Sequence, residues 1–392
     1  MRFRDALAGP SIAAIAEFKR RSPSLGDIRP DAEPGPLAAE YARAGAAAVS
    51  VLVDERFGGD WDDLRAARAS VGLPLLAKGF FSTEEHLRTA KDAGADAVLL
   101  LLRDLDDGQA RSLMAVAADL GLDTLVEAHD ADELARAAAL RAPVIGINAR
   151  NLSTFAIDRS AQLDLVAQSN YLPHEPVVVA ESGIQTRAQG AAAELAGADA
   201  ILVGSALMQA PDPGEKLREL LVRPLVKVCG LTREEDVAVA AEAGADLAGF
   251  VLAAESPRAA VEVLPVPDEL LAVAVWVGEA GESGASLDQV HERVEGVVRG
   301  RDAVLLREGE QVAQLLDLPW NAEDPGHYPD HWDRAAAASG RIVLAGKLAA
   351  DNVGEAIRRV RPWAVDASSR LEAEPGIKDP DKVRAYVEAA RD

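Results

Sequence analysis

The chain has 392 residues, of which 49% are hydrophobic, and its 64 acidic side chains outnumber 41 basic ones to give a net charge of −23. This length predicts two or three domains, and the apolar content is enough for large cores. The negative charge argues against a nucleic-acid partner, because too few cations are left to neutralise a phosphate backbone. A single cysteine excludes a disulfide framework, and no apolar run approaches the roughly 20 residues of a membrane span. No secretory signal is recognisable before Glu17, so we expect a cytoplasmic protein without a membrane partner.

The tripeptide Ala-Gly-Ala recurs along the chain, each time after a helical pattern and before an apolar run. Its copies stand at residues 44–46, 93–95, 196–198 and 243–245. Glycine is the usual residue just past a helix C-terminus, and continuous apolar runs are typical of parallel strands buried on both faces. The recurrence therefore predicts repeated βα units and an α/β fold.

The first half of the chain contains eight apolar runs separated by helical stretches. We predict strands at Ile12–Glu17, Ala47–Val53, Leu73–Lys78, Ala97–Leu102, Asp123–Glu127, Val144–Asn148, Val177–Glu181 and Ala200–Gly204. Eight βα units in about 210 residues fit a (β/α)₈ barrel of the TIM type. A doubly wound sheet is the competing architecture, but it usually stops at about five to seven strands.

A proline-bounded link near Arg223 separates this half from a second βα series, so the predicted domains are residues 1–222 and 224–392. Strands are expected in the second series at Leu225–Cys229, Leu247–Leu252, Ala272–Val277, Ala303–Leu306, Ile342–Ala345 and Trp363–Asp366. We therefore predict two (β/α)₈ barrels in tandem.

The second barrel is expected to be shortened. Only about 39 residues separate Ala303 from Ile342, and they hold one strand-like piece, either Gln314–Asp317 or Leu318–Asn321. A regular barrel needs two strands and three helices in this interval. The second domain is therefore either a heavily trimmed barrel or an incomplete one.

Polar residues follow the apolar runs of the first half at the points where the strands end. They are Glu17, Lys19, Lys78, Glu127, Asn148, Arg150, Glu181 and Ser182. In this fold the active site lies at the carboxyl ends of the strands. Lysines and glutamates that converge there shift one another's pKa and support general acid–base chemistry.

Small residues at the ends of the last two strands indicate a phosphate site. Ser182-Gly183 and Gly204-Ser205 stand where barrels commonly bind phosphate through backbone N–H groups. An acidic protein with such a local cradle suggests a small phosphorylated metabolite as partner. The six histidines have no metal-ligand spacing and no Gly-x-Gly-x-x-Gly follows a strand, so neither a metal nor a cofactor is expected.

Several of these motifs resemble those of known families. Ile15–Ser24, Ile145–Leu152, Glu181–Ile184 and Val203–Leu207 resemble the indole-3-glycerol phosphate synthase family. Val226–Thr232, Ser256–Arg258, Val365–Ser369 and Pro375–Asp379 resemble phosphoribosylanthranilate isomerase. The whole chain is similar to the fused bifunctional enzymes of tryptophan biosynthesis, in which the isomerase product is the synthase substrate.

For the first half the resemblance implies decarboxylating and dehydrating ring closure of 1-(2-carboxyphenylamino)-1-deoxyribulose 5-phosphate. Lys78 would be the general acid, and Glu127 would move protons with help from Glu17 and Lys19. Asn148 and Glu181 would position the substrate. Substrate and phosphate contacts would come from Ser22, Pro23, Phe80, Arg150, Ser182, Gly183, Gly204 and Ser205. The family usually has Lys-Asp-Phe where this chain has Lys78-Gly79-Phe80.

For the second half the resemblance implies Amadori isomerisation of N-(5-phosphoribosyl)anthranilate, with Cys229 as general base. The general acid would be Asp317, with Asp324 as the fallback. Substrate and phosphate contacts would come from Arg258, Gly346, Asp366, Ser368 and Ser369. Lys347 and Arg370 replace glycines of the family pattern at its phosphate turns.

Two hypotheses follow from these motifs. Either both barrels are enzymes, or an active synthase carries a non-catalytic C-terminal barrel that is structural or binds a phosphosugar. In both cases we expect phosphorylated small molecules as partners and a monomer or a weak homo-oligomer.

Overall fold

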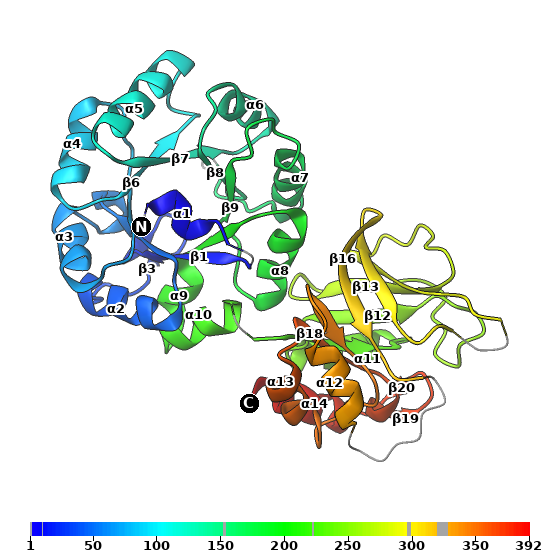
Figure 1. Ribbon diagram of the computed structural model, residues 1–392. Coiled ribbons are helices and arrows are strands. Elements are labelled where there is room, and N and C mark those ends of the chain that lie inside the picture. Colours follow the sequence, from blue (N-terminus) through cyan, green and yellow to red (C-terminus); the bar gives the residue numbers. More distant parts are fainter. Residues whose placement is uncertain (1, 10, 152–153, 222, 296–298, 320–327) are drawn as a thin grey trace. The chain divides into compact units, whose positions relative to one another are not determined.

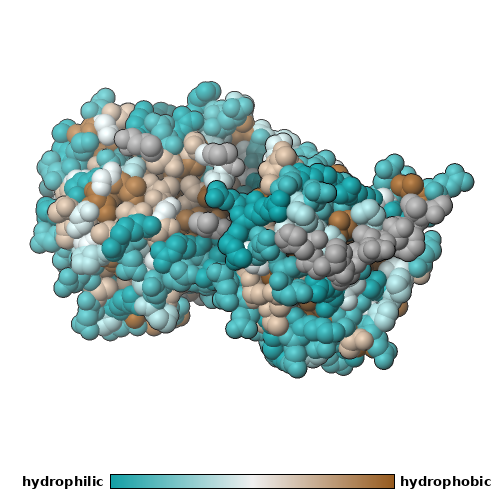
Figure 2. All heavy atoms as spheres, turned by 60° about the horizontal axis from the view of Figure 1, so that its bottom comes forward, coloured by the Kyte–Doolittle hydropathy of each residue, from teal (hydrophilic) through white to brown (hydrophobic). Residues whose placement is uncertain are grey.

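The computed structural model describes residues 2–9, 11–151, 154–221, 223–295, 299–319 and 328–392. The chain divides into two compact units, residues 1–186 with 190–222 and residues 187–189 with 223–392. Within the described residues each unit contains a closed barrel of eight strands (Figure 1). No helix in this part of the chain is long and apolar enough to cross a membrane. The face shown in Figure 2 is largely hydrophilic, as the net charge of −23 leads one to expect.

The first barrel is parallel throughout, and all eight predicted strands are confirmed. They are β1 (Ala13–Phe18), β4 (Ala48–Leu52), β5 (Leu75–Lys78), β6 (Ala97–Leu101), β7 (Asp123–Ala128), β8 (Val144–Asn148), β9 (Val177–Glu181) and β10 (Ala200–Val203). β1 pairs with both β4 and β10, which closes the barrel. The surrounding helices are α2 (Pro34–Ala44), α3 (Trp61–Ser70), α4 (Glu84–Asp92), α5 (Asp107–Asp119), α6 (Ala131–Ala139), α7 (Arg159–Ser169), α8 (Arg187–Ala196), α9 (Ser205–Gln209) and α10 (Pro213–Leu221).

A short helix, α1 (Phe3–Leu7), closes the amino end of this barrel. Phe3 and Leu7 are fully buried in a cluster with the inward-facing side chains of the strands. Arg2 is ion-paired with Asp123, and the backbone N–H of Arg4 donates to the same carboxylate, where β7 begins. The helix therefore fills one end of the barrel and leaves the carboxyl ends of the strands for the site.

The second barrel is trimmed but closed. Its strands are β11 (Leu225–Cys229), β12 (Leu247–Val251), β13 (Leu271–Val277), β14 (Leu287–His291), β15 (Ala303–Arg307), β16 (Glu310–Leu316), β17 (Ile342–Leu344) and β18 (Ala364–Ala367). Its helices are α11 (Glu234–Glu242), α12 (Pro329–Ala336), α13 (Val353–Val360) and α14 (Pro380–Arg391). β15 runs antiparallel to both of its neighbours, β14 and β16.

The prediction for this region was wrong in two respects. Ala303–Leu306 lies in the fifth strand, because the sequence reading missed β14, and this fifth strand is reversed. Of the two alternatives for the next strand, Gln314–Asp317 overlaps β16, whereas the described residues of Leu318–Asn321 form no strand. An antiparallel pair needs only a tight turn, while a parallel pair needs a crossover of a dozen or more residues. Reversing β15 is how the short chain still closes the barrel.

The turn between β15 and β16 consists of Glu308 and Gly309, with φ angles of 52° and 84°. Two successive residues with positive φ define the hairpin turn for which Asn-Gly is the best sequence. Gly309→Ala is expected to lower the free energy of unfolding of the second barrel by roughly 1 kcal/mol. Glu308→Asn should raise it, because asparagine tolerates this backbone region better than glutamate.

Urea titration followed by tryptophan fluorescence measures these changes, since four of the five tryptophans lie after residue 270. Glu310→Gln, in the adjoining strand, is the matched control and should change little. A Gly309→Ala variant as stable as this control would contradict the turn geometry.

Candidate active sites

A cavity of about 1020 Å³ opens at the carboxyl ends of the strands of the first barrel. The structure brings nearly all the predicted synthase residues to it. Its lining includes Glu17, Lys19, Ser22, Pro23, Lys78, Phe80, Glu127, Asn148, Arg150, Ser182, Gly183, Gly204 and Ser205. Glu181 is fully buried at the end of β9 and contacts the lining through Lys78.

Lys78 is surrounded by three buried carboxyl groups at the centre of this site. Its Nζ lies 2.6 Å from Glu181 Oε2, 3.4 Å from Glu17 Oε2 and 3.9 Å from Glu127 Oε2. Each of the three glutamates is less than 5% exposed. Burial opposes the charge on the lysine, but the three carboxyl groups outweigh it and raise the pKa of Lys78 well above its usual range. Lys78 therefore remains a protonated acid that can hydrogen-bond to a developing oxyanion.

Glu17 and Lys19 lie on one face of the chain at the end of β1, as their spacing predicts. Their ion pair has a length of 2.9 Å. Gly204 makes room for it, because a Cβ atom there would lie 2.4 Å from Glu17 Oε1 and 2.9 Å from Lys19 Nζ. A glycine at the end of β10 is thus required by the charged pair as well as by any phosphate that approaches its backbone.

Glu127 has a second cationic neighbour that the sequence analysis missed. His129 Nε2 lies 3.1 Å from Glu127 Oε1, and its Nδ1 lies 3.0 Å from Glu133 Oε2. Asn148 Nδ2 also donates to Glu127 Oε1, over 2.9 Å. Burial works against the Glu127 carboxylate, but His129 and Lys78 prevail and lower the pKa of Glu127 to about 2. Burial likewise opposes the histidine charge, yet the two glutamates raise the pKa of His129 to about 10.

Burial raises the pKa of Glu181 to about 8 against the opposing effect of Lys78. It occupies the space that Gly146 leaves in the neighbouring strand β8. A Cβ atom on Gly146 would lie 2.1 Å from Glu181 Oε1 and 2.7 Å from Leu125 Cδ2. The glycine in the Ile-Gly-Ile-Asn run therefore fixes where Glu181, and through it Lys78, can lie.

An aromatic wall stands on one side of the cavity. Phe80 stacks with Phe57 at a centroid distance of 6.5 Å, and the guanidinium of Arg56 lies 3.6 Å from the centroid of the Phe80 ring. Gly79 also fits its surroundings, since a Cβ atom there would lie 2.9 Å from Phe81 Cε1. Gly79 stands where the family pattern has an aspartate. Lys78 nevertheless has three carboxyl partners within 4 Å.

Further predicted binding residues line the rim of this cavity. Ser22 ends the short strand β2 (Arg21–Ser22), which pairs with β3 (Gly26–Asp27). Arg150 Nη1 reaches this hairpin by donating to Ser24 Oγ over 3.1 Å. Ser182 and Gly183 have φ angles of 68° and 74°, so two successive residues after β9 adopt left-handed backbone. Such a turn can aim successive N–H groups at an anion.

In the second barrel the predicted base, Cys229, ends β11 and is 7% exposed. Lys227, two residues earlier on the same face, is fully buried and donates to Asp366 Oδ2 over 3.0 Å and to Gln289 Oε1. Burial raises the pKa of the Cys229 thiol, and Lys227 limits that rise. The structure thus places Asp366 against Lys227 and next to the thiol.

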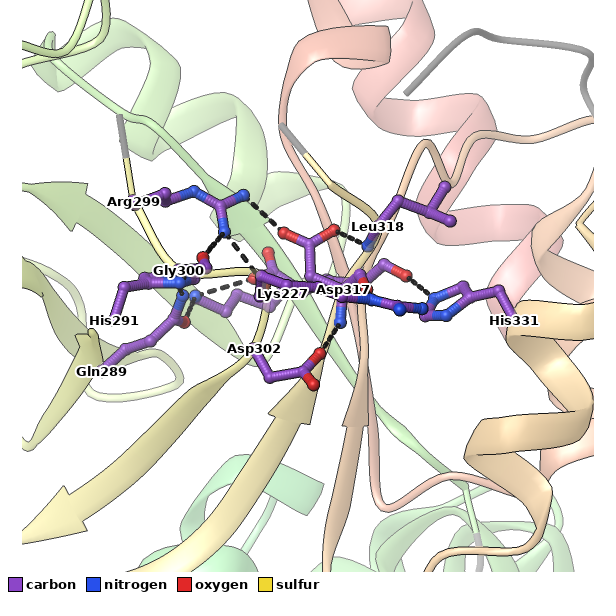
Figure 3. Close-up of polar contacts among 12 residues, drawn as sticks. Lys227, Gln289, His291, Arg299, Gly300, Asp302, Asp317, Leu318 and His331 are labelled. Atoms are coloured by element: carbon purple, nitrogen blue, oxygen red, sulfur yellow. Dashed lines mark hydrogen bonds and ion pairs between the residues drawn. The ribbon is translucent and has the colours of Figure 1, made fainter. Parts of the chain in front are cut away.

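The predicted acid, Asp317, directly follows β16 and is 9% exposed. Its Oδ2 accepts a hydrogen bond from Arg299 Nη2 over 2.5 Å, and its Oδ1 accepts one from the backbone N–H of Leu318 over 2.7 Å (Figure 3). Burial raises the pKa of Asp317, and Arg299 opposes that rise. The fallback, Asp324, lies outside the described residues.

The remaining isomerase residues also gather at the carboxyl ends of the strands. A Cβ atom on Gly230, next to Cys229, would lie 2.8 Å from Ser368 Oγ and 3.0 Å from Arg258 Cδ. Arg258 makes a bidentate ion pair with Glu372, in which Nε donates to Oε1 over 2.7 Å and Nη2 donates to Oε2 over 2.8 Å. Ser369 begins the 3₁₀ turn η2 (Ser369–Leu371). Gly346 has a φ of 99°, and a Cβ atom on it would lie 2.8 Å from Leu318 Cγ, next to Asp317.

Neither substitution at the phosphate turns disrupts the local structure. Lys347 takes a left-handed backbone with a φ of 55°, as the glycine of the family pattern could. Arg370 pairs with Asp351 over 2.7 Å and donates to the carbonyl of Lys347 over 3.2 Å. Among the described residues, no group of three histidine, cysteine or acidic side chains is arranged to hold a metal ion.

The fold and these sites define a pair of barrel enzymes on one chain, each built for acid–base chemistry. The family model of indole-3-glycerol phosphate synthase matches residues 1–220, and that of N-(5'phosphoribosyl)anthranilate isomerase matches residues 331–389. The tryptophan biosynthesis protein TrpCF of Yersinia pestis is 33% identical, over 99% of this chain and 87% of that protein. The chain therefore belongs to the bifunctional indole-3-glycerol phosphate synthase and phosphoribosylanthranilate isomerase family of tryptophan biosynthesis.

Other relatives each match one half of the chain. The indole-3-glycerol phosphate synthase of Albidiferax ferrireducens is 46% identical over 218 residues, which cover 55% of this chain and 81% of that protein. The crystal structure of TrpF from Jonesia denitrificans is 28% identical and covers 43% of this chain and 97% of that one, with a TM-score of 0.34.

Because Gly146 leaves the space that Glu181 fills, Gly146→Ala is expected to displace Glu181 and lower synthase turnover by roughly 100-fold. The isomerase activity of the same chain should stay unchanged, and the two assays together measure both effects. Gly72→Ala is the matched control, since nothing lies within 4 Å of a Cβ atom at Gly72. Equal synthase activity in the two variants would contradict the role of the close contact.

His129 generates a prediction about pH. With Glu127 predicted to act as a carboxylate, synthase activity is expected to fall as the pH drops through the lowered pKa of Glu127. His129→Gln removes one of the cations that lower this pKa, so the acid limb of the kcat profile should move to higher pH. The measurement is synthase kcat against pH for both proteins. An acid limb that keeps its position would show that His129 does not act on Glu127.

Proposed function

We propose that the cavity of the first barrel carries out the ring closure and that the Cys229–Asp317 end of the second barrel carries out the isomerisation. The observation that supports the first assignment is the protonated Lys78, held among three buried carboxyl groups at the mouth of the barrel. The matches to both halves of the chain support two activities rather than a synthase with a non-catalytic second barrel.

The ring closure needs an acid at a carbonyl group and a base for protons. Lys78 donates to the carbonyl oxygen of the ribulose chain while the carboxylated ring carbon of the aromatic amine attacks the carbonyl carbon. The carbon–carboxylate bond then breaks and carbon dioxide leaves. Loss of the resulting hydroxyl as water completes the indole. Glu127, ionised because His129 and Lys78 lower its pKa, accepts the proton lost from the methylene carbon next to the nitrogen. Lys78, reprotonated from solvent after the ring closure, protonates the departing hydroxyl.

The neighbours of these two groups position the substrate. Asn148 orients Glu127 by donating to its Oε1, and Glu181 positions Lys78 through an ion pair of 2.6 Å. We assign the aromatic ring to the wall formed by Phe80 and Pro23, and the substrate carboxylate to Arg150. The backbone around Ser182, Gly183, Gly204 and Ser205 would hold the phosphate, with Ser22 at the rim.

The isomerisation opens a ribose ring and moves a proton between carbons. Asp317 protonates the ring oxygen, the carbon–oxygen bond breaks, and the nitrogen lone pair forms a Schiff base. Cys229 then removes the proton from the adjacent carbon, and the enolamine that results becomes the ketone when its C1 carbon is protonated. Lys227 stabilises the thiolate form of Cys229, and Asp366 holds Lys227 in place.

The substrate of the second barrel also has a phosphate and a carboxylate to bind. Gly346, Ser368 and Ser369 would hold the phosphate from the ends of β17 and β18. Arg258, which is held by Glu372, would contact the substrate next to Cys229. Phosphorylated small molecules are thus the partners of both barrels. From the biosynthetic family we further propose a cytoplasmic enzyme that is a monomer or a weak homo-oligomer.

Reciprocal variants test the two assignments in one chain. The purified protein is given phosphoribosylanthranilate, and the fluorescence of the anthranilate group and the formation of indole-3-glycerol phosphate are followed. Lys78→Ala should accumulate the ribulose intermediate, with synthase turnover lowered by about 10²- to 10⁴-fold. Cys229→Ala should consume no substrate above the spontaneous rate while still closing the ring of added intermediate. Near-normal turnover in either variant would contradict the corresponding assignment.

A further inference from the structure

Two polar side chains of β14, Gln289 and His291, are buried inside the second barrel. They are 3% and 2% exposed, whereas Asp288 and Val290, which alternate with them, are half-buried on the other face of the strand. The interior of such a barrel is usually filled by branched apolar side chains. A buried amide or imidazole costs free energy unless it is hydrogen-bonded, so the partners of these two groups indicate what they do.

Gln289 holds the ammonium group of Lys227, as Figure 3 shows. Lys227 is fully buried, and its Nζ donates to Gln289 Oε1 and, over 3.0 Å, to Asp366 Oδ2. Burial opposes the charge on Lys227, but Asp366 and Cys229 raise its pKa. An ammonium group has three N–H donors, so the two oxygens leave one donor for the side of the thiol.

Lys227 and Cys229 share one small space next to β12. A Cβ atom on Gly249, which pairs with Cys229, would lie 2.7 Å from Cys229 Sγ and 2.9 Å from Lys227 Cε. Burial raises the pKa of the thiol, and three ions act on it as well: Lys227 from the same strand, Asp366 from β18 and Lys378 from the segment after η2. Among these ions Lys227 has the largest effect, and it favours the thiolate.

His291 determines which way the Gln289 amide faces. Gln289 Nε2 lies 2.8 Å from His291 Nε2, and an amide nitrogen can only donate. Burial, together with the cations Arg299 and Lys227, lowers the pKa of His291 to about 3, so the ring is neutral. Its Nε2 must accept the hydrogen bond from Gln289, and its one proton is therefore on Nδ1.

The surroundings of Nδ1 agree with this tautomer. Arg299 Nη1 lies 3.0 Å from Nδ1 but has the carbonyls of Gly300 and Arg301 as acceptors, at 3.1 and 3.2 Å. The backbone of Gly300 and Asp302 favours a proton on the ring. The donors thus have one consistent order, in which Lys227 donates to Gln289 and Gln289 donates to His291.

We propose that Gln289 and His291 are positioning residues of the isomerase reaction, which together hold the Lys227 ammonium beside the Cys229 thiol. His291 orients the amide, the amide oxygen holds the ammonium, and the ammonium favours the thiolate that removes the substrate proton. Neither residue has to touch the substrate. This inference rests on the proposed role of Cys229 as general base.

Loss of the amide should weaken the thiolate for two reasons. One N–H of a buried ammonium is left without an acceptor, which disfavours the charged form of Lys227. The freed ammonium can also turn further toward Asp366, whose negative charge offsets it. Both changes raise the pKa of Cys229 and lower the fraction of the base that is ionised.

Cys229 is the single cysteine of the chain, so alkylation by iodoacetamide reports on this thiol alone. The alkylation rate is measured against pH for the unmodified chain and for Gln289→Met. Only the thiolate reacts, so the midpoint of the curve gives the thiol pKa and the plateau at high pH reports access. In the variant the midpoint should rise by about one pH unit, and the isomerase kcat should fall about tenfold with little change in KM.

Two variants of His291 separate positioning from packing. His291→Gln places an amide oxygen where Nε2 lies, so it keeps the acceptor and should keep the midpoint and most of the isomerase activity. His291→Leu fills the space without an acceptor and should shift the midpoint in the same direction as Gln289→Met. Val290→Ala, on the other face of β14, is the matched control and should change neither quantity.

The outcomes are distinct, because synthase activity and tryptophan fluorescence report whether each variant folds. A midpoint that stays in place in folded Gln289→Met and His291→Leu would overturn the proposal. Equal losses in His291→Gln and His291→Leu would also overturn it, since packing alone would then explain them. A midpoint that moves while the isomerase kcat stays constant would support the hold on Lys227 and contradict Cys229 as the base instead.

Discussion

The synthase site depends on one arrangement of charge, a lysine enclosed by three carboxyl groups at the end of a closed parallel barrel. Transferring any one of these ions alone into the protein interior would cost several kcal/mol. Lys78, Lys19 and His129 supply cationic groups next to these glutamates, and each of the three is ion-paired with at least one of them. The strands hold these groups at fixed distances. Gly146 in β8 and Gly204 after β10 leave the volume that the carboxyl groups of Glu181 and Glu17 occupy.

The second barrel also places ions of opposite sign at its catalytic end, but it has fewer of them. Two of its ion pairs lie at the groups of the proposed reaction, Lys227 with Asp366 beside the Cys229 thiol and Arg299 with Asp317. Lys227 favours the charged form of the Cys229 thiol, whereas burial and Asp366 oppose it. The second pair stabilises the form of the acid that cannot donate a proton. Arg299 of this second pair lies in the sequence just before the reversed strand β15.

Most of the first barrel could be predicted from sequence, because buried parallel strands are continuous apolar runs and their ends are marked by polar residues. His129 was within reach, since it follows Glu127 at the same spacing at which Lys19 follows Glu17. β14 was missed because Leu287–His291 alternates between buried and half-buried residues and contains Asp288 and Gln289. The direction of β15 has no local signal, because strand direction is set by pairing with neighbours. Arg299 therefore could not be placed from sequence.

The shortened barrel shows how a loss of length can alter chemistry. A parallel crossover returns the chain to the opposite end of the barrel and packs a helix outside it. The reversed β15 makes that return itself, and Arg299, shortly before it in the sequence, is ion-paired with Asp317 at the end of β16. The hairpin that removed helices has thus added the cation Arg299 beside the acid Asp317. That cation favours the ionised form of Asp317 while burial favours the protonated form, so the shortened barrel holds its proposed acid between two opposing influences.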